Sequence, residues 1–379
     1  MTTRVALDLG TTNTSAAVVW KERSRLVPVR NRATSIPTAV AVDPQGRWLV
    51  GREARAQLIS RPADTVVGLK TFLGRDHTST AFRQAQQAVP YEILDAGGKV
   101  SARVGGSVVG LVEIAAMVLH ETKDQVQNTL GQKLDAAIMP VPDYFTQSQR
   151  DAFALSARTA GFKDTRVVDE SAAVTALVEC AGRGRDTRLV FLYGLGGGAF
   201  TATVLERTSG GHYEIVASTG EDLGGQLFDR EIARHLYHRF LQSRGIPALE
   251  DPVGLQRILD AAEGAKLALD AAEQTAVSVP YLLADANGQP IDLVDQLGRP
   301  ELIDLSGDLV RRTLKISESA LRAAGVVRSQ IDAVYLYGRP CGAQEVAAAT
   351  FRFFEQTPIR LPVGAPALGA AILAKREAF

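Results

Sequence analysis

The stretch that decides the fold is ALDLGTTNTSAAVV at residues 6–19, and a related stretch, LYGLGGGAFTATVL, follows 186 residues later at 192–205. Each has an apolar run, a turn of small residues and a second run that contains β-branched residues, a pattern that predicts a β-hairpin. A repeat at half of the chain length indicates a duplicated architecture rather than a solenoid, whose periods are about 20–50 residues.

Helical and strand patterns alternate between and after these hairpins. Apolar residues at helical spacing predict helices over residues 112–130, 148–160, 228–241, 255–272, 309–324, 344–354 and 365–375. Short apolar runs predict strands at 136–142 and 331–337. This alternation indicates a mixed α/β protein with partly parallel sheets. No low-complexity linker divides the chain, so we expect two lobes that share a cleft.

Composition and charge exclude several classes of protein. Of the 379 residues, 46% are hydrophobic and 22% are charged, as in ordinary soluble proteins. The 42 basic and 42 acidic residues cancel, which argues against whole-protein attraction to nucleic acid or to an anionic membrane. Two cysteines, Cys180 and Cys341, cannot form a disulfide framework and suit a reducing compartment. We therefore expect a cytoplasmic protein with neither nucleic acid nor a membrane among its partners.

The turns of the two hairpins consist of glycine and threonine, which expose backbone N–H groups with little side-chain bulk. Such turns surround phosphate oxygens, so two facing hairpins could clamp a di- or triphosphate between the lobes. For a lone turn of this kind a purely structural role is favoured, whereas two related copies make the two roles about equally supported. The GLGGGA run at 194–199 matches a dinucleotide-binding pattern, but a strand rather than a helix follows it. No GxxxxGK(S/T) motif occurs, which excludes a P-loop.

Asp8 lies at the end of an apolar run, where an unpaired carboxylate is costly to bury. A hydrated Mg²⁺ beside nucleotide phosphates would explain it, because this ion keeps several waters and takes only one or two carboxylates. Alternatively, Asp8 caps the turn by accepting hydrogen bonds from its backbone N–H groups. Both interpretations remain open at this point.

Several ordered blocks together resemble the nucleotide-binding domain of the 70-kilodalton heat-shock chaperones, a branch of the actin-like ATPase superfamily. The resemblance covers nearly the whole chain and is carried by LDLGTTN at 7–13, TSIPTAV at 34–40, VGREA at 50–54, LKTFLGR at 69–75, VPDYFTQSQR at 141–150, VVDESAA at 167–173 and LGGQLFD at 223–229. It implies a two-lobed actin-like α/β fold with duplicated mixed sheets, flanking helices and ATP or ADP with Mg²⁺ in a central cleft. It also implies a nucleotide-binding part without the peptide-binding domain of the family.

The resemblance implies a division of the chain and a set of site residues. Lobe I would comprise 1–183, with a core of 1–38 and 112–183 and a peripheral subdomain of 39–111. Lobe II would comprise 184–379, with a core of 184–222 and 306–379 and a peripheral subdomain of 223–305. Lys70 and Glu170 would be catalytic, and Asp8 would hold the metal through water. The cofactor-binding residues would be Asp8, Gly10, Thr11, Thr12, Asn13, Gly196, Gly197, Gly198, Gly224, Gly225, Glu263, Lys266 and Gly338.

The sequence also departs from the family pattern. Gly194 and Thr201 replace two aspartates of the second phosphate loop, which act on the metal and the attacking water. On the adenosine side Leu267 replaces an arginine, and Asp270 and Val363 are also unusual. We further expect the bulky Tyr337 and Pro340 to obstruct the base pocket.

These departures leave four functions to weigh. The leading expectation is an ATP- or ADP-binding protein of this family with weak or absent hydrolysis, which acts as a chaperone-like or regulatory switch toward a protein partner. The alternatives are a pseudo-ATPase scaffold that binds no nucleotide, and an active ATPase whose metal ligands have moved to Asp169 or Asp222. A sugar kinase of the same superfamily is the weakest alternative, because no sugar-facing base is evident.

Overall fold

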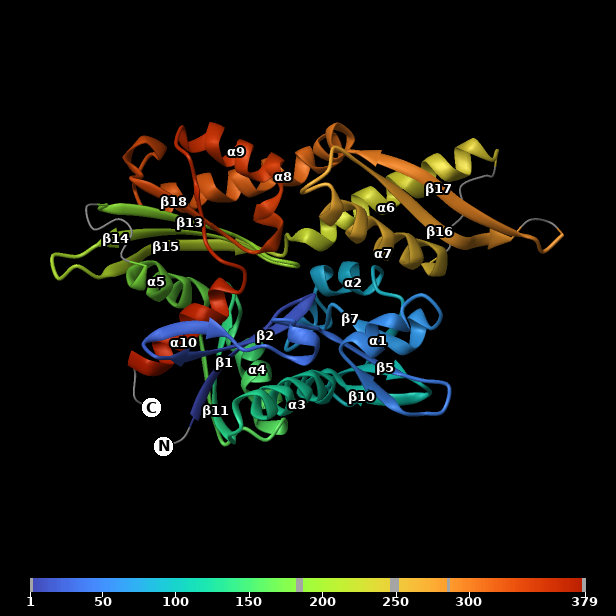
Figure 1. Cartoon of the computed structure of the whole chain (residues 1–379), viewed down its shortest axis with the longest axis horizontal. Coiled ribbons are helices and arrows are strands. Elements are labelled where there is room, and N and C mark those ends of the chain that lie inside the picture. Colours follow the sequence, from blue (N-terminus) through green and yellow to red (C-terminus); the bar gives the residue numbers. More distant parts are fainter. Residues whose placement is uncertain (1–2, 182–186, 246–251, 285–286, 377–379) are drawn as a thin grey trace.

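Two mixed sheets form the centre of the protein. The computed structural model, shown in Figure 1, describes residues 3–181, 187–245, 252–284 and 287–376. The strands of the first sheet are β1 (Thr3–Leu9), β2 (Asn13–Trp20), β3 (Arg23–Leu26), β11 (Leu134–Val141) and β12 (Asp164–Asp169), with β4 (Ile36–Pro37) paired to β2. Those of the second are β13 (Leu189–Leu195), β14 (Phe200–Arg207), β15 (Tyr213–Glu221), β18 (Ala333–Tyr337) and β19 (Ile359–Arg360).

The two sheets have the same topology. Their orders are β12-β11-β1-β2-β3 and β19-β18-β13-β14-β15. In each, a central strand pairs antiparallel with the strand that follows it and parallel with a later one. Both predicted hairpins are therefore confirmed, and the chain has the duplicated, two-lobed mixed α/β architecture.

Helices cover the faces of both sheets. The α-helices of the described residues are α1 (Arg52–Ala56), α2 (Thr80–Gln86), α3 (Leu111–Leu130), α4 (Gln147–Thr159), α5 (Glu170–Cys180), α6 (Gly225–Ser243), α7 (Pro252–Ala268), α8 (Arg299–Ala323), α9 (Gln344–Phe354) and α10 (Ala365–Arg376). Among these described residues, none of the helices combines the length and apolar character needed to cross a membrane.

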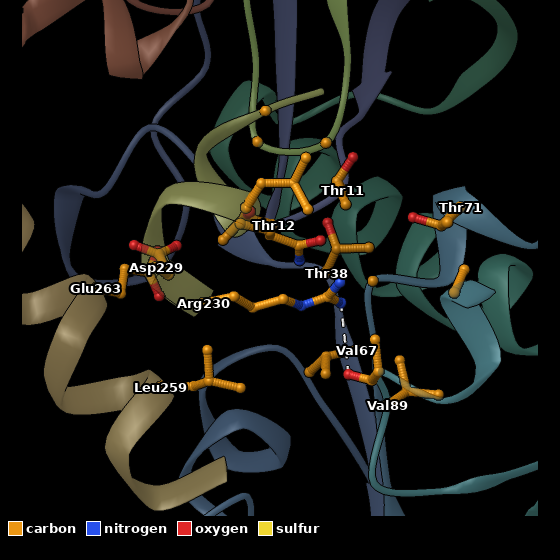
Figure 2. A pocket seen from close by; sticks show the side chains of 18 of the residues that line it. Thr11, Thr12, Thr38, Val67, Thr71, Val89, Asp229, Arg230, Leu259 and Glu263 are labelled. Atoms are coloured by element: carbon orange, nitrogen blue, oxygen red, sulfur yellow. Dashed lines mark hydrogen bonds between the residues drawn. The ribbon is translucent and has the colours of Figure 1, made fainter. Parts of the chain in front are cut away.

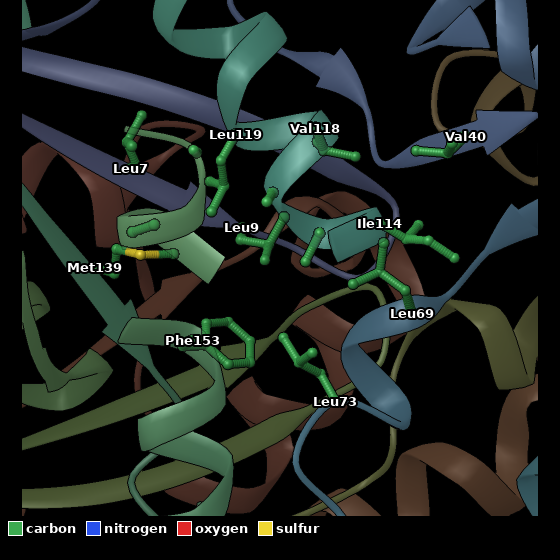
Figure 3. Packing of buried hydrophobic residues seen from close by; sticks show 14 of the residues in the cluster. Leu7, Leu9, Val40, Leu69, Leu73, Ile114, Val118, Leu119, Met139 and Phe153 are labelled. Atoms are coloured by element: carbon green, nitrogen blue, oxygen red, sulfur yellow. The ribbon is translucent and has the colours of Figure 1, made fainter. Parts of the chain in front are cut away.

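The alternation of side chains along β1 fixes what lies on each face of the first sheet. Leu7 and Leu9 point into the core formed with α3 and α4, as Figure 3 shows. Ala6 points the other way, toward α10. Leu69 and Leu73, both fully buried, lie in the same core as Leu7 and so anchor the segment that carries Lys70.

Helices α5 and α10 lie between the two sheets (Figure 1). Val174 and Val178 of α5 pack against the second sheet, whereas Ala173 packs with α10 against the first. The contact between the helices requires Gly369, because a Cβ there would overlap the carbonyl oxygen of Ala173. The separation of the two sheets therefore depends on a close helix–helix contact.

The position of α10 differs from the predicted division of the chain. The sequence assigns 365–376 to the second lobe, whereas α10 packs on β1, β2 and β11 of the first sheet. The reason is its content of small residues, five alanines and Gly369, which fits the narrow space beside α5. The predicted boundary at 183/184 lies outside the described residues.

Each of the two central sheets is accompanied by smaller groups of helices and strands. On the first side they are the sheet of β5 (Ala39–Val42), β6 (Trp48–Val50) and β7 (Thr65–Val67) and the sheet of β8 (Glu92–Asp95), β9 (Val100–Val104) and β10 (Ser107–Gly110). On the second side α6 and α7 share a core with the hairpin of β16 (Gln274–Ala284) and β17 (Pro290–Gly298). Helix α7 thereby faces α1 across the molecule (Figure 1).

The close packing of α10 on α5 predicts a large cost for a single methyl group. Gly369→Ala should destabilise the protein by about 1–3 kcal/mol, because the helices must move apart to admit the Cβ. Gly264→Ala, in the exposed middle of α7 where nothing lies within 4 Å, should instead stabilise it by about 0.5–1 kcal/mol. Denaturant unfolding monitored by circular dichroism measures both, and equal effects of the two substitutions would contradict the packing argument.

Candidate functional site

The turns of the two hairpins have matching hydrogen bonds. The N–H of Gly10 donates to the carbonyl of Asn13 at 3.1 Å, and the N–H of Gly196 donates to that of Ala199 at 2.8 Å. A Cβ on Gly10 would overlap the Asn13 carbonyl oxygen, so this tight turn requires glycine. Both turns thus leave their central N–H groups free of bulky side chains.

The structure brings these two turns into contact at the centre of the molecule. A Cβ on Gly197 would lie 2.6 Å from Oγ1 of Thr12, and one on Gly198 would lie 2.6 Å from Oγ1 of Thr11. A larger residue at positions 197 or 198 would therefore require the Thr12 or Thr11 side chain, or the turns themselves, to move. The segments around Gly10 and Gly197, 186 residues apart, form one surface.

Three further glycines complete this surface. The N–H of Gly225 donates to the carbonyl of Gly196 at 2.9 Å, which ties the start of α6 to the second turn. Gly224 packs directly on Gly197, since a Cβ there would lie 2.5 Å from the Gly197 carbonyl carbon. Gly338 has a φ of +95° and lies against the backbone of Leu195.

A cavity of about 180 Å³ opens beside these turns. Of the predicted site residues, all but Gly224 line it: Asp8, Gly10, Thr11, Thr12, Asn13, Lys70, Glu170, Gly196, Gly197, Gly198, Gly225, Glu263, Lys266 and Gly338. Gly224 lines an adjoining cavity of about 300 Å³ that shares the two turns. We call them the inner and outer cavities.

Buried charges gather at the base of the inner cavity. Lys70 is only 6% exposed, and its Nζ lies 5.6 Å from the ring centroid of Phe153. Burial raises the pKa of the Asp8 carboxyl, although the Lys70 charge opposes this effect. Burial likewise raises the pKa of Glu170 to about 7, with Lys70 opposing and the neighbouring carboxylates Asp8 and Asp143 adding to the rise. The cluster therefore contains three carboxyl groups and one lysine amine.

Asp143 belongs to this cluster although the sequence did not single it out as a site residue. Burial raises the pKa of its carboxyl, which accepts hydrogen bonds from the N–H and Oγ of Ser171. Asp143 comes shortly after the parallel strand β11, and carboxyl ends of parallel strands are where ligand sites form. That position in the chain is the signal that could have identified it.

The two positions that lack the family carboxylates are neighbours in the second sheet. Gly194 on β13 is the direct partner of Thr201 on β14 and of Tyr337 on β18. The fully buried ring of Tyr337 lies against Gly194, on the side of Glu170. Tyr337 thus lies toward the acidic cluster, and the expectation that it obstructs a base pocket needs revision.

The predicted adenosine side is held together by ion pairs. Lys266 pairs with Asp229 at 2.5 Å and donates to the carbonyl of Gly225 at 3.1 Å. Glu263 pairs with Arg55 of α1, across the molecule from α7. Leu267, Asp270, Pro340 and Val363 also line the inner cavity.

The outer cavity contains a largely buried arginine. Figure 2 shows Arg230 extending from α6 toward Thr38 and Val67, with Thr12 on one side and Leu259 on the other. Its guanidinium donates one hydrogen bond, of 3.4 Å, to the carbonyl of Ala88. Burial and the charge of Arg234 lower the pKa of Arg230. This side chain, like Arg55, bridges segments that belong to the two halves.

The alternative metal ligands have other partners. Asp169 pairs with Arg150, and Asp222 pairs with Arg75 and accepts a hydrogen bond of 3.0 Å from the Tyr144 hydroxyl. Neither aspartate lines the inner cavity. Asp222 does line the outer cavity beside the two turns, so an ATPase with metal ligands at these positions stays a prediction.

The raised pKa of Glu170 predicts a pH-dependent stability of the ligand-free protein. An acid whose pKa is higher in the folded chain keeps its proton there, so stability falls as pH rises from about 4.5 to about 7. Glu170→Gln should remove this loss and be more stable than the wild type at about pH 8, by up to about 3 kcal/mol. Urea titrations across this range measure it. The exposed Glu214→Gln should keep the wild-type pH profile, and an unchanged profile for Glu170→Gln would contradict the prediction.

Comparisons with known proteins agree with this architecture. The family model described as Hsp70 protein matches residues 4–375. The chaperone protein DnaK of Stenotrophomonas maltophilia (strain R551-3) is 35% identical over 377 residues, which cover 97% of this chain and 58% of that protein. This chain thus spans less than two thirds of the length of that relative. With the duplicated sheets and the paired turns, these matches show that the chain belongs to the Hsp70 family of nucleotide-binding chaperones.

Proposed function

We propose that this chain binds ATP or ADP in the inner cavity, hydrolyses ATP slowly or not at all, and uses the nucleotide to control its cleft toward a protein partner. The observation that carries the proposal is the contact of Gly197 and Gly198 with Thr12 and Thr11 at the wall of the cavity. Membership of the Hsp70 family supports it.

The main chain supplies most of the phosphate site. N–H groups of the two turns would donate to the phosphate oxygens, with the hydroxyls of Thr11 and Thr12 as further donors. Lys70 would offset part of the phosphate charge, and in a site shielded from water this attraction is strong. Transfer of a phosphoryl group depends mainly on such positioning and electrostatics.

The donor set fits a hydrated Mg²⁺. Among the described residues no three His, Cys, Asp or Glu side chains converge to hold a metal ion. Mg²⁺ needs fewer protein ligands, since it is held by one or two carboxylates together with substrate phosphates and waters. Asp8 and Glu170, both buried and lining the cavity, would hold it through water. When bound, Mg²⁺ neutralises phosphate charge that develops during transfer.

Slow hydrolysis follows from the absence of carboxylates at two positions that flank the second turn. Gly194 and Thr201 provide no carboxylate to orient the attacking water or the metal. A positioned acid or base contributes about 10²–10⁴ in rate, so the loss of such groups leaves binding with little chemistry. The purine would lie toward Lys266, Leu267 and Val363, beyond the second turn.

The pairs that bridge the molecule suggest how nucleotide controls the cleft. Arg55 on α1 pairs with both Glu263 and Asp260 on α7. Arg257 of α7 also donates to the carbonyl of Ile59 at 3.2 Å. Widening of the cleft must break these contacts, so they oppose the escape of a bound nucleotide.

Calorimetric and thermal unfolding with ADP or ATP tests the proposed function. A nucleotide at 100 times its dissociation constant stabilises the folded chain by about 2.7 kcal/mol, which should appear as a clear rise in Tm. Lys70→Ala should reduce this stabilisation. Absence of any shift at about millimolar nucleotide would favour a scaffold without nucleotide, whereas steady phosphate release that Lys70→Ala abolishes would favour an active ATPase.

Removal of the bridging pair should speed nucleotide release. We expect Arg55→Ala to raise the dissociation rate of a fluorescent ADP about three- to tenfold, because two half-buried ion pairs no longer oppose opening. Stopped-flow displacement by unlabelled ADP measures the rate. Arg52→Ala, an exposed residue of the same helix, is the matched control, and equal rates for the two variants would exclude the bridge as a barrier.

A further inference from the structure

The outer cavity combines an apolar wall with a positively charged side chain. Leu58, Val67, Val89 and Leu259 line it together with Arg230, and Figure 2 shows three of these apolar residues around the Arg230 side chain. The cavity volume of about 300 Å³ lies at the lower end of the range of small-molecule pockets, which are mainly apolar with a few polar groups. The outer cavity therefore has the size and the walls of a ligand site.

The acidic residues of the outer cavity already have basic partners. Arg55 pairs with both Asp260 and Glu263. The other two acids pair with bases outside the cavity lining: Asp229 with Lys266 and Asp222 with Arg75. None of these four carboxylates is the partner of Arg230.

The Arg230 guanidinium makes no ion pair among the residues that the structure describes, and its one hydrogen bond, to the carbonyl of Ala88, is long at 3.4 Å. A guanidinium has five N–H donors. Among the described residues, the Nε of Arg75 is fully buried without a partner, whereas no nitrogen of Arg230 is. The remaining Arg230 donors are therefore accessible from the cavity that this side chain lines. Burial and the charge of Arg234 lower the pKa of Arg230, and a bound anion would oppose both effects.

We propose that the outer cavity is a second ligand site, which takes a small organic carboxylate with an apolar body and holds the carboxylate on Arg230. A guanidinium binds a carboxylate through two parallel N–H···O bonds, and the apolar wall would cover the body of the ligand. An inorganic anion would leave this wall uncovered, and a neutral molecule would leave the guanidinium without a counter-ion.

Such a ligand would contact both halves of the molecule. Val67 and Val89 belong to the first half, whereas Leu259 and Arg230 belong to the second. Widening of the cleft would separate these residues, so a ligand bound between them opposes it and slows the release of nucleotide. This consequence rests on the proposed function, whereas binding of the carboxylate does not.

Calorimetry with 1-naphthoate as the probe tests the site, with 1-naphthalenemethanol as its neutral analogue. We expect the wild type to bind naphthoate at least about tenfold more tightly than the alcohol, because only the carboxylate pairs with the guanidinium. Saturating ADP should not displace naphthoate, since the nucleotide would occupy the inner cavity.

Substitution of the arginine tests its role directly. Arg230→Gln should weaken naphthoate binding about tenfold or more and leave binding of the alcohol unchanged. Arg244→Gln, which removes an exposed arginine at the far end of α6, is the matched control and should keep the wild-type affinity. In stopped-flow displacement, saturating naphthoate should slow the release of a fluorescent ADP about fivefold from the wild type and not from Arg230→Gln.

Equal affinity of the wild type for naphthoate and the alcohol would overturn the inference, and this comparison holds even where a variant does not fold. Wild-type affinity in Arg230→Gln, or full displacement of naphthoate by ADP, would overturn it as well. An ADP release rate that saturating naphthoate leaves unchanged would overturn the link to the cleft. If ADP does not bind at all, the proposed function fails, and the comparison of naphthoate with the alcohol still decides whether the second site exists.

Discussion

The contact between two main-chain turns is the constraint on which the rest of the structure depends. Thr11 and Thr12 lie against Gly198 and Gly197, and this contact requires the two sheets to lie close together. Helices α5 and α10 set that separation because they fill the space between the sheets. Gly369 allows these helices to approach so closely. Packing far from the cavity thereby determines whether the turns can form one surface.

The cavity beside the turns holds an unbalanced set of charges. Lys70 lies near the carboxylates Asp8 and Glu170, Asp143 lies near Glu170, and burial opposes the ionisation of all three acids. Burying ionisable groups without full compensation costs stability, and proteins keep such clusters mainly where a ligand completes them. A nucleotide with its cation brings both signs of charge, and therefore suits this cavity better than an ion of either sign alone.

The local elements could be predicted from the sequence, and the non-local contacts could not. The two hairpins follow from apolar runs around Gly-Thr and Gly-Gly-Gly turns, because turn chemistry acts within a few residues. Helix α10 was recognised, but its place on the first sheet depends on contacts with Ala173 that no local pattern encodes. The proximity of the two turns was inferred from the repeat. The pairing of Tyr337 with Gly194 needs the register of β18 on β13, and the arginine partners of Asp169 and Asp222 likewise come from distant segments.

Binding and chemistry depend on different parts of this site, and the sequence departs from the family mainly in the second. The donors that would hold a polyphosphate are main-chain N–H groups, which require only that Gly10, Gly197 and Gly198 remain small and correctly placed. Hydrolysis depends instead on the charge of particular side chains around the attacking water. Because Tyr337 fills the space beside Gly194, the loss of a carboxylate there leaves no void and does not disturb the turns. Replacement of the carboxylates at positions 194 and 201 therefore leaves the cavity and its main-chain donors in place. The capacity of such a chain to bind nucleotide need not follow its capacity to cleave it.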